Sequence, residues 1–188
     1  MTRLLLPLLL VLAVSGASAD YDEEADLEQA RQATAAFGKA LKSELLTAMK
    51  SGGPITAIEV CNTQAPAIAR AVSLEQDVQI SRVSLKNRNP ENAPSSWQTR
   101  VLEMFEARKQ SGEPPNSLTW HETAPVESGH EFRFMQAIPT GGPCLQCHGV
   151  AIDPAVAEKL AAFYPEDKAT GFRQGDLRGA FVVTKSLQ

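Results

Sequence analysis

The residues most able to carry chemistry in this chain lie in one short segment, GGPCLQCHGV, at residues 141–150. Cys144 and Cys147 are separated by two residues, and His148 follows the second cysteine directly. This Cys-x-x-Cys-His pattern is typical of covalent haem attachment. Two thiols at this spacing can add to the two vinyl groups of the porphyrin, and the adjacent imidazole can bind the iron. The segment therefore predicts one haem c, attached through Cys144 and Cys147 and ligated by His148.

Three other chemistries use two cysteines at this spacing. A redox-active Cys-x-x-Cys pair normally opens a helix in a thioredoxin-like setting, whereas glycines and a proline surround the pair here. A zinc site needs a fourth ligand, which Cys61 or His121 could supply, but a second Cys-x-x-Cys or His-x-x-His half is missing. A disulfide across so tight a loop would constrain few residues and stabilise the fold little. The position of His148 favours haem over all three.

The second axial ligand of the iron stays open when spacing alone is considered. Methionine is the usual partner of histidine in small cytochromes c and raises the reduction potential. A methionine can equally be core filler, a histidine a surface residue, and a lone cysteine a small buried hydrophobe. Spacing alone therefore supports Cys61, Met104 and His121 equally as the second axial ligand. The candidates are Met49, Met104, Met135, His121, His130 and Cys61.

The first nineteen residues, MTRLLLPLLLVLAVSGASA, have the features of a secretory signal. Arg3 precedes an apolar run over residues 4–14, and Ala17-Ser18-Ala19 matches the usual cleavage site. The run is too short to cross a bilayer, which takes about 20 residues. We therefore expect a signal peptide at residues 1–19, cleaved after Ala19. The mature chain, residues 20–188, is expected in the bacterial periplasm with no integral membrane segment.

The length of the chain indicates how many domains to expect, and its net charge indicates which kinds of partner to expect. The chain has 188 residues, enough for one mature domain with a proper core, and a formal net charge of −4. A mildly acidic chain is not expected to bind nucleic acid, which needs clustered Lys and Arg. A redox partner or a signalling protein of unknown identity is the expected partner. Three cysteines is an odd number for an exported protein, so Cys61 needs a role of its own.

The hydrophobic pattern predicts an α+β domain, with a small antiparallel sheet and N-terminal helices. One helix is expected over residues 20–51, and Ser-Gly-Gly-Pro should end it. A second helix should follow over residues 54–72, kinked at Pro66, with Cys61 facing inward. Further helices are expected at residues 95–109 and 153–164, and strands at 78–85, 117–123, 130–138 and 180–186.

Four stretches together resemble a known family: AIEVCNTQAPAIA, RVSLKNRNPENAP, QAIPTGGPCLQCHG and YPEDKATGFRQGDLRGAFVV. They span about residues 54–186 and resemble small exported haem c proteins, a family of undefined function that is related in fold to PAS sensor domains. The resemblance implies a PAS-like domain. It also implies an iron held by the histidine of the pentapeptide and by a cysteine thiolate from an upstream helix. The matching positions here are His148 and Cys61.

Thiolate ligation stabilises ferric iron, so the resemblance implies redox or ligand sensing, or low-potential electron transfer. Two alternatives remain: a conventional electron-transfer cytochrome c with His/Met or His/His ligation, and a haem peroxidase-like enzyme. No catalytic residue is assigned, and a binding protein is expected rather than an enzyme. Haem propionates usually meet arginine side chains, although each arginine could equally be an ordinary surface residue. The candidates are Arg82, Arg88, Arg133 and Arg178.

Overall fold

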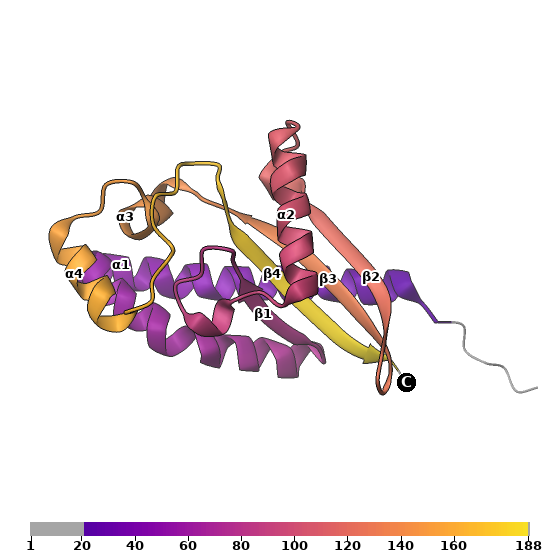
Figure 1. Ribbon diagram of the computed structural model, residues 1–188. Coiled ribbons are helices and arrows are strands. Elements are labelled where there is room, and N and C mark those ends of the chain that lie inside the picture. Colours follow the sequence, from indigo (N-terminus) through magenta and orange to yellow (C-terminus); the bar gives the residue numbers. More distant parts are fainter. Residues whose placement is uncertain (1–20, 188) are drawn as a thin grey trace, which may run out of the picture.

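The computed structural model describes residues 21–187, so the expected signal peptide lies outside the described residues (Figure 1). Four strands and four α-helices follow one another as α1, β1, α2, β2, β3, α3, α4 and β4. Short 3-10 turns lie at residues 90–92, 115–117 and 142–144. The bounds are α1 Glu23–Gln76, β1 Gln79–Val83, α2 Ser96–Gln110, β2 Thr119–Val126, β3 Gly129–Pro139, α3 Leu145–His148, α4 Pro154–Phe163 and β4 Leu177–Leu187.

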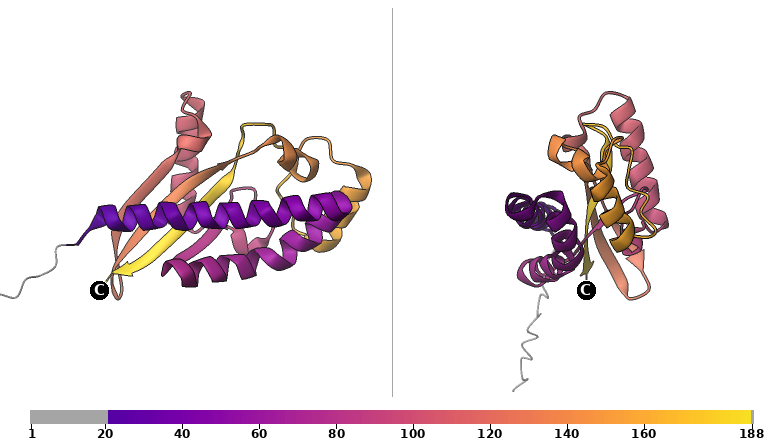
Figure 2. Two further views of the ribbon diagram at one scale, coloured as in Figure 1. Left: turned by 180° about the vertical axis from the view of Figure 1, so that it is seen from behind. Right: turned by 90° about the vertical axis from the view of Figure 1, so that its left-hand side faces the viewer.

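The first element, α1, is a hairpin of two antiparallel helical arms (Figure 2). Asp22 caps the first arm, because its carboxylate accepts a hydrogen bond from the Ala25 amide at 3.1 Å. The arms meet at Gly52 (φ −157°, ψ 17°) and Gly53 (φ 69°, ψ −163°), whose backbone is not helical. The prediction of two helices joined at Ser-Gly-Gly-Pro is confirmed. The backbone angles stay helical at Pro66, where the sequence predicts a kink.

The four strands form one antiparallel sheet in the order β1-β4-β3-β2. The α1 hairpin covers one face of this sheet and α2 covers the other (Figure 2). Side chains of β3 alternate between the two layers. Phe132 and Phe134 join the core under α1, while Met135 and Ala137 join the core under α2. The predicted α+β class with a small antiparallel sheet is confirmed.

A third and smaller core lies beyond the sheet, where α4 packs on the second arm of α1. Ile58 of α1 contacts Val156, Leu160 and Tyr164, and Cys147 packs against this cluster. Lys159 of α4 also forms an ion pair with Glu59 of α1. In Figure 1, α3 and α4 gather at one end of the molecule and the β2–β3 hairpin turn lies at the other. The α1 hairpin therefore brings its second arm to the cysteine segment.

No helix within residues 21–187 combines the length and the apolar character that a membrane crossing requires.

The turn between the two arms of α1 generates a prediction about stability. The backbone of Gly53 lies in a region that is essentially restricted to glycine. Gly53→Ala should lower the free energy of unfolding by about 1–3 kcal/mol in a urea titration. Lys50→Ala, at an exposed helical position, is the control and should change it by less than about 0.5 kcal/mol. Equal effects of the two substitutions would contradict the turn geometry.

Candidate functional site

The cysteine segment runs from the end of β3 through a 3-10 turn, Gly142–Cys144, into the single helical turn of α3. Gly149 ends α3 and donates its amide hydrogen bond to the Leu145 carbonyl at 2.9 Å. A Cβ atom at Gly149 would lie 2.5 Å from that oxygen, so only glycine fits there. The loop between α4 and β4 holds the segment from outside. The Phe172 amide donates to the His148 carbonyl, and the Gly171 amide donates to the Gly149 carbonyl, each at 2.9 Å.

His148 is a neutral imidazole, and one of its two ring nitrogens is hydrogen-bonded to the protein. Its Nδ1 lies 2.7 Å from the carbonyl oxygen of Ala169. Burial, followed by the positive charges of Arg178 and Arg88, lowers the pKa of His148 to about 2. The ring is therefore neutral near pH 7, so Nδ1–H donates to Ala169 and Nε2 keeps a free lone pair. This is the arrangement that orients a metal-binding histidine.

Arg88 connects the cysteine segment to the loop that carries Ala169. Its Nε lies 3.0 Å from Oδ2 of Asp167, and each of these two side chains is 11% exposed. Its Nη2 donates to the carbonyls of Cys147 and Ala169. Asp167 in turn accepts a hydrogen bond from the Ala169 amide at 2.7 Å. The buried pair thus fixes the carbonyl that orients His148.

Sequence reasoning missed Asp167 and Ala169. Both lie in the stretch YPEDKATGF, which carries part of the family resemblance but no motif with a recognisable chemistry of its own. The contribution of Ala169 is a backbone carbonyl, which any residue could supply. The sequence makes Arg88 a propionate candidate, and the structure shows its guanidinium already bonded to the protein.

Cys61 lies on the second arm of α1, and its side chain is exposed to solvent. The prediction that it faces inward is wrong. Ile58 and Ala65 on the same helix face are buried. The elements that cover these two residues do not cover Cys61. Protein still surrounds the thiol on several sides. Burial therefore raises the pKa of Cys61, while the positive charges of Arg82 and Arg88 oppose the rise.

Three cysteines and three arginines share this end of the molecule. Cys61, Cys144 and Cys147 are all free thiols. The charge of Cys61 acts on the pKa of Cys147, which places the two sulfurs in one neighbourhood. Arg82, Arg88 and Arg178 each lower the pKa of His148. The structure therefore brings together the predicted residues Cys61, Arg82, Arg88, Cys144, Cys147, His148 and Arg178.

Arg133, the fourth arginine candidate, lies elsewhere. Its guanidinium is paired with Glu122 at 3.1 Å and with Glu131 at 2.7 Å. It also lies 5.0 Å from the ring centroid of Trp97 at the start of α2. These contacts place Arg133 on the α2 face of the sheet, whereas Cys61 belongs to the helix that covers the opposite face. The structure does not bring Arg133 to His148.

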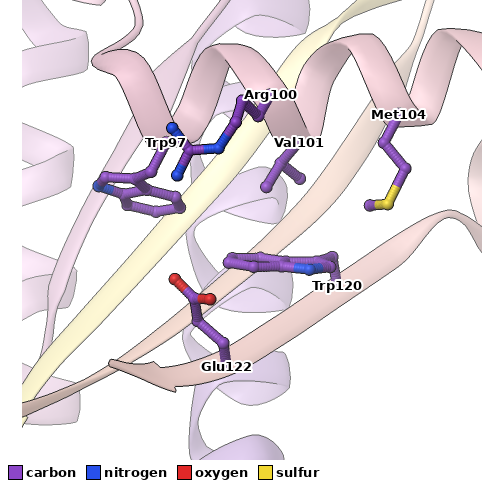
Figure 3. Close-up of a pocket in the computed structure, with 6 residues that line it drawn as sticks. All are labelled: Trp97, Arg100, Val101, Met104, Trp120 and Glu122. Atoms are coloured by element: carbon purple, nitrogen blue, oxygen red, sulfur yellow. The ribbon is translucent and has the colours of Figure 1, made fainter. Parts of the chain in front are cut away.

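Two of the methionine candidates, Met104 and Met135, lie on the α2 side of the sheet. Met135 is fully buried in the core under α2. Met104 lines a cleft of about 160 Å³ between α2 and β2, facing Trp120 (Figure 3). Met49 lies on the first arm of α1, three residues before Gly52.

The other two histidines are at the far end of the sheet or beside the N-terminus of α1. Nε2 of His121 lies 3.2 Å from Glu23. His130 is exposed and pairs with Leu187 near the β2–β3 turn, opposite α3 in Figure 1. Within residues 21–187, no three His, Cys, Asp or Glu side chains converge as ligands for a metal ion. The zinc interpretation therefore has no ligand set in that part of the chain.

The buried Arg88–Asp167 pair generates a second prediction. Arg88→Met leaves the Asp167 carboxylate buried without its partner, so the free energy of unfolding should fall by about 3–5 kcal/mol. The control is the double variant Arg88→Met/Asp167→Leu, which removes both charges and should recover part of the loss in the same denaturant titration. The single variant Asp167→Leu completes the comparison. If the double variant lost as much stability as Arg88→Met and Asp167→Leu lose in sum, the pairing would be contradicted.

Comparisons with known proteins support the family to which the sequence pointed. No curated protein matches this chain. A solved structure described as the crystal structure of the cyanobacterial heme-protein Tll0287 is similar to it, with a TM-score of 0.61 and 26% sequence identity. The similarity covers 90% of this chain and 99% of that one. The model of the Tll0287-like family matches residues 17–186. This chain therefore belongs to the Tll0287-like family.

Proposed function

We propose that this chain is a periplasmic monohaem c protein that acts in redox or ligand sensing, or in low-potential electron transfer. Cys144 and Cys147 attach the haem in this proposal, and His148 and Cys61 are its axial ligands. The observation that carries the proposal is the state of His148. A neutral imidazole within Cys-x-x-Cys-His donates through Nδ1 to Ala169 and leaves Nε2 free for iron.

The donor set of the site fits a covalently bound haem. Thioether formation needs two free thiols on one short segment, and Cys144 and Cys147 provide them. The site is also rich in positive charge, with three arginines around His148. Haem carries two carboxylates and would balance part of that charge. The similar solved structure is that of a heme-protein, which agrees with this choice.

Cys61 is the sixth ligand that the structure favours. The charge of Cys61 acts on the pKa of Cys147, which places Cys61 beside the cysteine segment, whereas Met104 and Met135 lie on the α2 side of the sheet. Its thiol is free and exposed. The family resemblance independently assigns a cysteine from an upstream helix to this role. These observations support His/Cys ligation over the His/Met and His/His alternatives.

Haem bound in this way supplies one-electron chemistry at iron. The anionic thiolate of Cys61 would favour the ferric state and a low reduction potential. A redox partner or a signalling protein would receive the output. The four-stranded antiparallel sheet with flanking helices supports a PAS-like relationship, and the N-terminal sequence supports export.

Covalent attachment generates the third prediction. After expression with a haem maturation system, the wild-type chain should keep its haem through a denaturing gel stained for haem. Cys144→Ala/Cys147→Ala should lose all covalently bound haem, because no thioether bond can form. Cys61→Ala is the control with one cysteine removed and should keep the haem. A wild-type chain without covalent haem would refute the proposal.

Axial ligation generates the fourth prediction. Cys61→Ser should change the ferric absorption spectrum and raise the reduction potential by on the order of 0.1 V or more. Axial ligands tune haem potentials across about 0.8 V. Met104→Leu is the matched control and should leave both unchanged, because Met104 lines the cleft under α2. An unchanged spectrum in Cys61→Ser would remove Cys61 from the iron.

A further inference from the structure

The positively charged side chains around His148 outnumber the carboxylates that form ion pairs with them. Arg82, Lys86, Arg88 and Arg178 belong to this group, and its one ion pair with a partner in residues 21–187 joins Arg88 to Asp167. Lys86 donates to the carbonyl of Thr170 and lies 4.7 Å from the ring centroid of Phe172. Burial of positive charge without a counter-ion is costly. The folded chain therefore keeps a surplus of positive charge beside its proposed cofactor site.

Arg178 has partners for its guanidinium, but all of them are neutral. Its Nη1 donates to Oγ of Ser84 at 3.1 Å and to the Lys86 carbonyl at 3.3 Å. The guanidinium also lies 5.3 Å from the ring centroid of Phe172. Burial and two neighbouring arginines lower the pKa of Arg178 to about 10. These contacts orient the side chain and leave its charge unbalanced.

The side chain of Arg82 has no hydrogen bond or ion pair to another residue within 21–187. It lies on β1 opposite Phe181 of β4. Its neighbour Val83 joins the core under α2, and Ile80 joins the core under α1. By strand alternation, Arg82 points to the α1 face, toward the arm that carries Cys61. Burial lowers the pKa of Arg82, and Cys61 and Tyr164 are the groups that oppose this shift.

We propose that Arg82 binds a haem propionate, which deepens the proposed function and rests on it. The side chain is partly buried, it has no hydrogen-bond or ion-pair partner in the described residues, and it stands on the same side of the sheet as the second arm of α1. A guanidinium fork matches a carboxylate with two parallel hydrogen bonds. Arg88 cannot serve in this way, because Asp167 and two carbonyls already occupy it. Arg178 adds a second positive charge to the same carboxylate-binding region.

The reduction potential of the holoprotein tests this proposal. Arg82→Gln removes a cation next to the haem, so addition of an electron becomes less favourable and the potential should fall. The freed propionate should regain an ordinary carboxylic pKa, so the potential should rise as the pH falls from about 6 to 4. Arg82→Lys keeps the charge and should retain most of the wild-type potential. Arg133→Gln removes an arginine at the α2 face and should leave the potential unchanged.

A parallel set in the Cys61→Ser background identifies the partner of Arg82. A propionate partner predicts that Arg82→Gln lowers the potential there too. If Arg82→Gln no longer lowers the reduction potential once Cys61 is replaced by serine, Arg82 interacts with the thiolate and not with a propionate. That result would overturn the proposal. A lower melting temperature with an unchanged potential would make Arg82 merely structural and would also overturn it. Wild-type protein without covalent haem would instead reject the proposed function, which the haem-stained gel reports separately.

Discussion

The hydrogen bond between Nδ1 of His148 and the carbonyl of Ala169 is the contact on which the site depends. An imidazole that is neutral and donates through Nδ1 has one free lone pair, on Nε2, and a fixed ring plane. The buried Arg88–Asp167 pair holds the Ala169 carbonyl in place, since Arg88 bonds that carbonyl and Asp167 bonds the Ala169 amide. The same arginine also bonds the Cys147 carbonyl. One largely buried ion pair therefore orients both His148 and the segment that carries it.

The fold assembles this site from segments that are far apart in the chain. The second arm of α1 supplies Cys61, β1 supplies Arg82, and the loop after β1 supplies Arg88. The cysteine segment follows β3, and the loop before β4 supplies Asp167 and Ala169. The sheet and the α1 hairpin hold these segments, while α4 fastens the cysteine segment to α1 through Ile58 and Cys147. The site residues thus lie on loops, helical segments and one strand at one end of the layered structure.

Much of the fold could be predicted from the sequence, because turns and strands depend on the backbone preferences of a few residue types. Ser-Gly-Gly-Pro predicted the turn in α1, and alternating β-branched residues predicted the strands. The orientation of Cys61 could not be predicted, since helical periodicity does not say which positions on a face another element covers. Nor could the four arginines be separated. Arg82 and Arg133 both lie on strands, and only the order of the strands and the two faces of the sheet distinguish them.

We propose that iron in this protein is bound by a histidine nitrogen and a cysteine sulfur. X-ray absorption at the iron edge of the ferric holoprotein measures that first shell directly. The proposed His/Cys ligation predicts one sulfur scatterer beside five nitrogen scatterers, from the porphyrin and His148, with the sulfur supplied by Cys61. A first shell made only of nitrogen or oxygen scatterers would contradict it. A sulfur that persists in Cys61→Ser would point to methionine and contradict it equally.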